Sequence, residues 1–312
     1  MLKFLFYLLI LITFPITFIS CQSEEKKEEN AGEKKKYKDV EVKDGKSLLW
    51  KIEGNGLEKP SYLFGTMHLI EEEYWVFPES LEERVKDCDR LVMEVEDISN
   101  AAGALDLMKA KEGETLKDMF TPEQYDSLMN IGAEAMGMGK EAFEKVFGGM
   151  KPFGIISAMS KASFKGATKS YEMTLISLAN LNKIEKGGLE TIEQQLGFFD
   201  QIPAEKMKTI ILETMKTVGE DNGEMEEMMK IYKEQDLDKL GKFMIEQSPE
   251  MMENEEVLLK GRNKAWIPKI EEFAKSGQNF IAVGAAHLVG DEGVINLLRE
   301  KGYTLTPIRT DK

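Results

Sequence analysis

The chain has few residues that cross-link or titrate near neutral pH. It contains two cysteines and two histidines in 312 residues. Two cysteines allow at most one disulfide, which excludes a disulfide-built scaffold. Two histidines leave few candidates for proton transfer at neutral pH. Basic residues are also outnumbered, because 41 Lys and Arg face 56 Asp and Glu, a net charge of −15. Such an acidic chain repels phosphate backbones, so we expect no nucleic-acid partner.

Several common catalytic motifs are also absent from the sequence. There is no His-Glu-x-x-His pair of a zinc peptidase, no Gly-x-Ser-x-Gly elbow and no Walker phosphate loop. The chain is nevertheless 42% hydrophobic and long enough for one large domain or two small ones. It can therefore bury a sizeable core, and its chemistry must come from other motifs.

The first 20 residues predict a signal peptide. Lys3 precedes an apolar run, 4–19, which is short for a helix that spans a bilayer. The run ends in Ser20-Cys21, which resembles the cleavage site of bacterial lipoproteins. We expect Cys21 to carry the lipid and to anchor the protein to a membrane of the bacterial cell envelope, either periplasmic or surface-exposed. The alternative is an uncleaved N-terminal anchor.

Residues 21–47 predict a tether between the lipidated cysteine and a folded domain. The segment 22–46 contains eight acidic residues, eight lysines and almost no apolar side chain. It cannot bury enough apolar surface to offset its chain entropy, so we expect it to be disordered. The folded domain is then 48–312.

The domain begins and ends with strand patterns. Apolar strands are expected at 47–52 and 61–66, which we expect to form a hairpin, and at 90–95 after a helix. Two more are expected at 278–283 and 303–308. A strand–helix–strand order favours parallel strands. The sequence from about 100 to 265 predicts mostly helix. We therefore expect an α/β (α+β) fold, with a central mixed sheet built from the N- and C-terminal segments and a large helical insertion.

Both histidines occupy the same local pattern. Gly65-x-x-His68 and Gly284-x-x-His287 each follow an apolar strand, and Glu94 ends another. The carboxyl ends of parallel strands commonly bind ligands, so these side chains are expected to share one cleft. Two imidazoles and a carboxylate suit Mn²⁺, Co²⁺ or Zn²⁺. They equally suit metal-free hydrolysis, in which one group activates water and another protonates the leaving group.

These motifs carry a family resemblance. The chain resembles the TraB/GumN family, which is related to the Tiki proteins and more distantly to hydrolases of the erythromycin-esterase type. The matching segments occur in the family's order and are 63–68, 91–94, 188–191, 262–263 and 283–290.

The resemblance implies a lipid-anchored, metal-dependent and peptidase-like hydrolase that acts on a peptide or another small substrate. His68, Glu94 and His287 would bind Mn²⁺, Co²⁺ or Zn²⁺ and form the catalytic centre. The alternatives are a metal-free, esterase-like hydrolase and a non-catalytic binding lipoprotein. Because both histidines follow strands on loops, we expect their substitution to reduce stability little.

Three further residues take their expected roles from the resemblance. Glu190 would be an additional ligand or acid–base group, directly before a helix that begins with the capping box Thr191-x-x-Gln194. Arg262 would bind a substrate carboxylate or orient Glu94 and Glu190, and Asn263 would support it. The family often has a Gly-x-Asp where this chain has Ser170-Tyr171-Glu172, so Glu172 receives no role.

Overall fold

The structure is a computed structural model that describes residues 40–96, 106–160, 164–218, 223–247 and 254–310. Its centre is a six-stranded sheet with the order β6-β4-β7-β2-β1-β8. The strands of this sheet are β1 (Leu49–Gly54), β2 (Ser61–Thr66), β4 (Arg90–Val95), β6 (Glu185–Glu190), β7 (Asn279–Gly284) and β8 (Tyr303–Ile308). The expected α/β fold with a mixed central sheet is confirmed.

The middle of the sheet is buried on both faces. Every residue of β2 and β7 is buried. Buried parallel strands appear in a sequence as apolar runs, which is why β2 and β7 could be predicted. The helices α14 (Gly261–Ser276) and α15 (Val294–Glu300) pack on strands across the width of the sheet, α14 on β6 and β7 and α15 on β8. Another helix, α8 (Tyr171–Asn182), packs on β4 and on α2 (Glu79–Asp87).

Strand directions determine where the candidate residues lie. β7 pairs in parallel with β2 on one side and with β4 on the other, and β4 pairs in parallel with β6. β1 forms the expected antiparallel hairpin with β2 and pairs antiparallel with β8. The carboxyl ends of β2, β7, β4 and β6 therefore meet along one edge of the sheet.

The strand β6 was not expected, because its sequence Glu-Lys-Gly-Gly-Leu-Glu has two glycines and three charges. Its glycines allow close packing against the neighbouring chain. A Cβ atom on Gly188 would lie 2.6 Å from the backbone nitrogen of Glu96, and one on Gly187 would lie 2.9 Å from the Phe273 ring. The glycines that suggested a loop are thus required by the packing of this strand.

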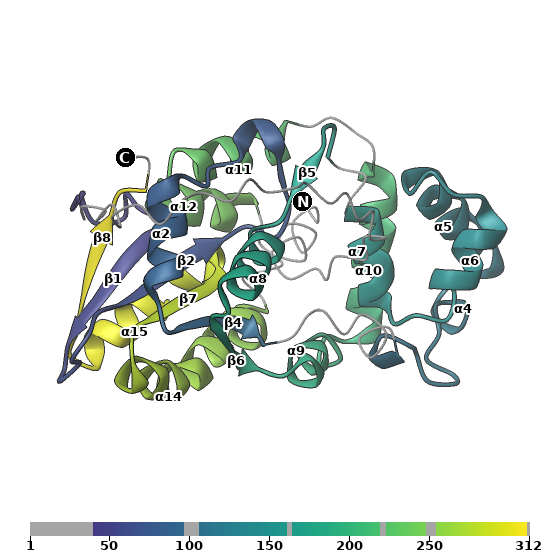
Figure 1. Cartoon of the computed structure of the whole chain (residues 1–312). Coiled ribbons are helices and arrows are strands. Elements are labelled where there is room, and N and C mark those ends of the chain that lie inside the picture. Colours follow the sequence, from purple (N-terminus) through teal and green to yellow (C-terminus); the bar gives the residue numbers. More distant parts are fainter. Residues whose placement is uncertain (1–39, 97–105, 161–163, 219–222, 248–253, 311–312) are drawn as a thin grey trace.

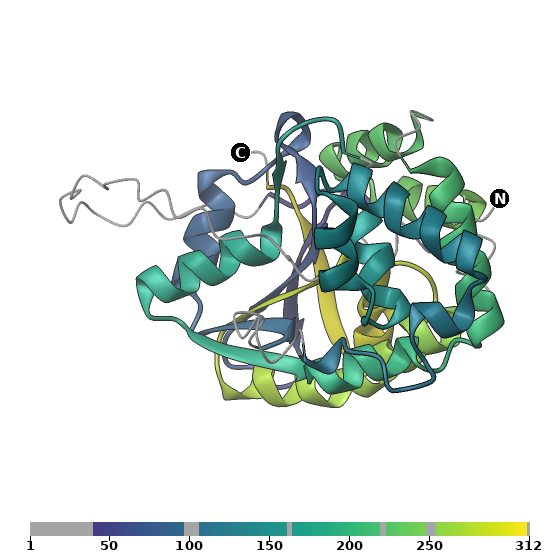
Figure 2. The same cartoon turned by 90° about the vertical axis from the view of Figure 1, so that its right-hand side faces the viewer.

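The rest of the described middle segment is mainly helical (Figures 1 and 2). Figure 1 shows α4, α5 and α6 at the end of the molecule farthest from the sheet. A short two-stranded sheet joins β3 (Ile70–Glu71) to β5 (Thr168–Lys169). The helices of this segment are α4 (Leu116–Met119), α5 (Pro122–Ala135), α6 (Lys140–Phe147), α7 (Pro152–Ser160), α9 (Ile192–Phe199), α10 (Ala204–Thr217), α11 (Glu224–Lys233) and α12 (Leu237–Gln247).

Three short helical turns flank the sheet edge. The turn η1 (Glu72–Tyr74) follows β3, and the π-helical turn η3 (Glu256–Lys260) leads into α14. The third, η4 (Ala285–Leu288), follows β7 and carries the second histidine motif.

The chain packs against the domain before the boundary expected at Leu48. The backbone N–H of Val42 donates to Pro307 (3.2 Å), and Lys46 forms an ion pair with Asp236. Ser47 is fully buried and its hydroxyl donates to the carbonyl of Leu49 (2.9 Å). The expected signal peptide, Cys21 and most of the expected tether lie outside the described residues. Within the described part of the chain, no helix is long and apolar enough to cross a membrane.

Candidate functional site

The edge of the sheet brings the expected residues together. His68 follows β2, Glu94 lies near the end of β4 and Glu190 is the last residue of β6. The strand register pairs Val95 with Glu190, so the carboxylates of Glu94 and Glu190 come from neighbouring parallel strands. Both are buried. A buried carboxylate is costly unless it is paired and hydrogen-bonded, so the partners of these two define the site.

The guanidinium of Arg262 is the main partner of both carboxylates. Its Nη2 lies 2.7 Å from Glu94 Oε2 and 2.6 Å from Glu190 Oε1, and its Nε lies 3.2 Å from Glu190 Oε2. Its Nη1 donates to the carbonyl of Leu258 (3.1 Å) and points at His287 Nε2 (3.2 Å). A guanidinium has five N–H donors, so all five are used inside the protein. Arg262 thus orients the two glutamates and has no donor left for a substrate carboxylate.

Two further side chains complete the carboxylate cluster. Gln195 Nε2 donates to Glu94 Oε2 and to Glu190 Oε1, at 3.0 Å in each case. The Trp266 indole donates to Glu190 Oε2 (3.0 Å). Burial raises the pKa of Glu190, whereas the charge and hydrogen bonds of Arg262 and the hydrogen bond of Trp266 act against this increase. Gln195 follows the expected capping box, which the structure contains, but its role was not predicted.

The glycines of the two Gly-x-x-His motifs, Gly65 and Gly284, make different contacts. The backbone N–H of Gly284 donates to Glu94 Oε1 (2.8 Å), which ties β7 to β4. A Cβ atom on Gly65 would lie 2.8 Å from the Leu288 side chain and 3.2 Å from the Cα of Ala285. Gly65 thus allows the two histidine motifs to pack closely together.

His287 is held as a neutral imidazole. Asn263 donates from Nδ2 to the carbonyls of Glu292 (2.9 Å) and His287 (3.4 Å), so its Oδ1 is the acceptor for His287 Nδ1 (2.6 Å). The ring proton is then on Nδ1, and Nε2 has a lone pair that faces Arg262. Burial lowers the pKa of His287 well below its ordinary value of 6.5, and the charges of Arg262 and His68 lower it further.

The position of His287 corrects one expectation. The residue lies in η4 rather than on an exposed loop, and it is 1% exposed. Its ring packs on Trp266, with the ring centroids 4.4 Å apart. Substitution of His287 therefore removes core contacts as well as a functional group.

His68 differs from His287 in exposure and in charge. Its side chain is 15% exposed, and its Nδ1 lies 3.0 Å from Glu172 Oε1. Its Nε2 has no hydrogen-bond partner among the described residues. Burial lowers the pKa of His68, but the charge and hydrogen bond of Glu172, together with the charge of Glu94, outweigh this and raise the pKa above its ordinary value of 6.5.

Glu172 is the residue that the sequence left without a role. It lies in the first turn of α8 and is buried. Ser170 Oγ donates to its Oε2 (3.1 Å), and the hydroxyl of Thr66 is a second donor. Burial raises the pKa of Glu172, but the charge and hydrogen bond of His68 outweigh burial and lower it. The available signal was the family's acidic residue at this position.

The residues expected to bind a metal do not form a complete set of ligands here. Among the described residues, no group of three or more His, Cys, Asp or Glu side chains is arranged to hold a metal ion. The reason is visible at Glu94 and Glu190, whose oxygens already accept hydrogen bonds from Arg262. The guanidinium thus occupies the position next to the two carboxylates that a metal ion would need. The same guanidinium faces Nε2 of His287, so among these residues only His68 has a ring nitrogen without a hydrogen-bond partner.

Comparison with known proteins identifies the family of the chain. No curated protein and no solved structure is significantly similar to the chain. The model of one protein family matches residues 48–307, which include every residue of the site described above. The chain belongs to the TraB/PrgY/gumN family.

Proposed function

We propose that the protein is a hydrolase in which His68 is the acid–base group. The observation that carries this proposal is the state of its ring. Nδ1 lies beside Glu172, while Nε2 is a buried atom that has no hydrogen-bond partner among the described residues, and another part of the side chain is exposed. This is the arrangement of a general base whose second nitrogen is oriented by a carboxylate.

The reaction that suits this group is hydrolysis of an ester or amide. Neutral His68 takes a proton from water at Nε2 as the water oxygen attacks the carbonyl carbon. The imidazolium then returns that proton to the leaving oxygen or nitrogen, and the bond to the carbonyl carbon breaks to give an acid and an alcohol or amine. The carboxylate of Glu172 stabilises the imidazolium while it exists. A peptide-like substrate is the choice that the family resemblance favours.

The other residues of the family motifs have supporting roles in this proposal. Arg262 keeps Glu94 and Glu190 fixed, and Asn263 keeps His287 in one tautomer. The charge of Glu94 also favours the protonated form of His68. In this proposal none of these residues needs to exchange a proton with the substrate.

A metal-dependent hydrolase is the second candidate. Its support is that His68 and His287 both have Nδ1 next to a side-chain oxygen, as in metal-binding imidazoles, but in the described part of the chain only the Nε2 of His68 is without a hydrogen-bond partner, since that of His287 faces Arg262. A bound Mn²⁺, Co²⁺ or Zn²⁺ would supply an activated water or polarise a carbonyl. The pairing of Glu94 and Glu190 with Arg262 is the reason that the metal-free reaction is proposed first.

We also propose that the protein is a lipoprotein of the bacterial cell envelope, anchored through Cys21. The support is the apolar run 4–19 that ends in Ser20-Cys21. The charged segment 22–39 would then separate the lipid from the domain. Substrates would reach the site in the periplasm or at the cell surface.

The test is a hydrolysis screen with variants of the whole chain. Fluorogenic esters and peptides are incubated with the wild type in EDTA and, separately, in Mn²⁺. We expect turnover in EDTA, loss of turnover in His68→Gln and a reduced rate in Glu172→Gln. The matched control is Glu73→Gln, the same substitution at an exposed carboxylate, which should retain full activity.

The alternative outcomes separate the competing functions. Activity that EDTA removes and Mn²⁺ restores favours the metal-dependent hydrolase. Full activity in folded His68→Gln contradicts both mechanisms. Binding of peptides without turnover in any condition favours the non-catalytic binding lipoprotein.

A further inference from the structure

The first histidine motif is bound by a helix that the proposed reaction does not use. The hydroxyl of Tyr232, in α11, donates to the carbonyl of Gly65 (2.8 Å). A backbone hydrogen bond from Met67 reaches the same hydroxyl. Tyr232 is 1% exposed, so these contacts lie inside the core. The phenol therefore binds two positions of the turn that leads to His68.

Gly65 needs this partner because β1 does not extend far enough to supply one. In an antiparallel pair, the N–H and the carbonyl of one residue point to the same neighbouring strand. The N–H of Gly65 donates to the carbonyl of Leu48 (2.9 Å), but the ladder between β1 and β2 ends at the pair Leu49–Phe64. The carbonyl of Gly65 thus points past the end of β1. Buried carbonyls are normally hydrogen-bonded, and Tyr232 supplies the donor.

Two further side chains of α11 bind the chain after His68. Sδ of Met229 accepts from the backbone N–H of Glu71 (3.4 Å), and the ammonium of Lys233 donates to the carbonyl of Glu73 (2.6 Å). Residues three or four positions apart share one face of a helix, so these contacts come from the face that also presents the phenol. That face holds the backbone on both sides of His68.

The ring of Tyr232 contacts the other half of the pair formed by His68 and Glu172. It packs on Tyr171, with the ring centroids 5.5 Å apart, and Tyr171 directly precedes Glu172 in α8. The hydroxyl of Tyr171 donates to the carbonyl of Val76 (2.8 Å), which fixes its ring at the other end. Tyr232 therefore reaches the motif of His68 through its hydroxyl and the start of α8 through its ring.

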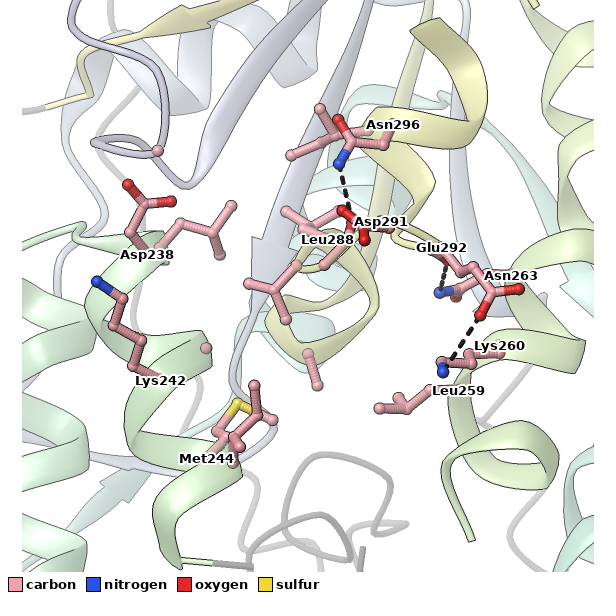
Figure 3. A pocket seen from close by; sticks show the side chains of 18 of the residues that line it. Asp238, Lys242, Met244, Leu259, Lys260, Asn263, Leu288, Asp291, Glu292 and Asn296 are labelled. Atoms are coloured by element: carbon pink, nitrogen blue, oxygen red, sulfur yellow. Dashed lines mark hydrogen bonds and ion pairs between the residues drawn. The ribbon is translucent and has the colours of Figure 1, made fainter. Parts of the chain in front are cut away.

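The second histidine motif is supported in another way. Its turn η4 and the helix α12 line opposite sides of a cavity of about 580 Å³. Figure 3 shows Met244 on the α12 side of this cavity and Leu288 of η4 on the other. His287 is held by Asn263 of α14, which donates to its carbonyl (3.4 Å) and accepts from its Nδ1 (2.6 Å). A change in α11 should therefore act on His68 and leave His287 in place.

We propose that Tyr232 is a positioning residue for His68 and sets the distance between its imidazole and the carboxylate of Glu172. That distance is 3.0 Å from Nδ1 to Oε1. The hydroxyl fixes the turn that leads to His68, and the ring fixes the start of α8, which carries Glu172. Tyr232 acts through these two residues and not on the substrate. This role rests on the proposed hydrolase function, in which His68 is the acid–base group.

The test replaces Tyr232 by phenylalanine in the whole chain. Tyr232→Phe retains the ring that packs on Tyr171 and removes the hydrogen bond to Gly65. The matched control is Tyr303→Phe, because Tyr303 is also buried and its hydroxyl donates to Glu271 (3.2 Å), but it lies in β8 at the edge of the sheet. With a substrate from the hydrolysis screen, kcat should fall at least about tenfold in Tyr232→Phe while KM changes less than about twofold, since a misplaced catalytic group slows the chemical step. Tyr303→Phe should retain both values.

A spectroscopic readout does not require hydrolysis. The chain has only two histidines, so ¹⁵N-histidine labelling gives two sets of ring signals, assigned with His68→Gln. At one fixed pH, the ring signals of His68 should shift in Tyr232→Phe, because Nδ1 moves relative to the carboxylate of Glu172. They should remain in place in Tyr303→Phe. The signals of His287 should remain in place in both variants.

The outcomes separate the positioning role from the proposed function. An unchanged kcat or unchanged His68 signals in folded Tyr232→Phe, or equal changes in Tyr303→Phe, would overturn the positioning role. An unfolded Tyr232→Phe beside a folded Tyr303→Phe would also overturn it, because Tyr232 would then act on stability alone. If the wild type hydrolyses no substrate, the proposed function fails, and the NMR comparison still decides whether Tyr232 positions His68.

Discussion

Replacement of Arg262 by methionine should be one of the most destabilising substitutions in the domain. The guanidinium is 1% exposed and is the only cation bound to Glu94 and Glu190 among the described residues. Removal of one partner from a buried ion pair costs about 3–5 kcal/mol, because the remaining charge stays buried. Since a domain is stable by only about 5–15 kcal/mol, Arg262→Met should lose a large part of the free energy of unfolding.

The assay is urea unfolding at pH 7, with Arg90→Met as the matched control. Arg90 is also an arginine paired with a glutamate, Glu185, but the pair is exposed and should contribute about 1 kcal/mol or less. A compensated variant, Arg262→Met with Glu94→Gln and Glu190→Gln, should recover part of the lost stability, because no buried charge remains unpaired.

The pH dependence provides an independent check of the same reasoning. Burial already raises the pKa of Glu190 in the native state, and Arg262 limits that rise. A carboxyl group whose pKa is raised by folding favours the native state below its unfolded pKa, and this contribution is lost as pH rises through the folded pKa. Without Arg262 the loss should be larger, so Arg262→Met should be most destabilised at neutral pH and closer to the wild type near pH 4. A loss below about 1 kcal/mol at pH 7, or no recovery in the compensated variant, would refute the argument.

Three further predictions concern the histidines and the anchor. Glu172→Gln should lower the pKa of His68, since Glu172 raises it. The acid limb of the pH–rate profile lies above pH 6.5 in the wild type and should move to lower pH in this variant. The NMR titration of His68 should move with it. His287→Ala should destabilise the domain more than His68→Ala in urea unfolding, by about 1–3 kcal/mol, because Oδ1 of Asn263 and one N–H of Arg262, both buried, each lose their hydrogen-bond partner. Equal losses would contradict the different burial of the two rings. Cys21→Ser should abolish incorporation of labelled lipid and release the protein from the membrane fraction, and a wild type that takes up no label would contradict the lipoprotein assignment.

Much of the sheet could be predicted because its strands have a strong local signal. β2 and β7 are buried on both faces and therefore appear as apolar runs. Their parallel arrangement also placed His68, Glu94 and His287 at one edge. β6 could not be predicted in the same way, because its glycines and charges resemble a loop. It is a strand because β4 pairs with it in parallel. A side chain at Gly188 would clash with the backbone of Glu96, directly after β4.

The residues that complete the site were harder to predict than the motif histidines. Glu172 and Gln195 lie in the first turns of helices, where acidic and polar side chains are common and usually exposed. Nothing in the local sequence shows that one faces His68 and the other bridges two buried carboxylates. These contacts depend on how the middle segment returns to the sheet, which is set by tertiary packing rather than by periodicity.

The two histidines share one sequence pattern but have opposite electrostatic environments. Arg262 faces His287 and favours its neutral form, whereas Glu172 and Glu94 act on His68 and favour its cation. A general base becomes positively charged when it takes a proton, so a nearby negative charge stabilises the state that the reaction forms. His287 would have to accept its proton beside a guanidinium that already donates to its Nε2. The difference in charge, together with the unpaired Nε2, therefore favours His68 over His287 for the proton transfer that we propose, and His287 contacts Arg262 instead.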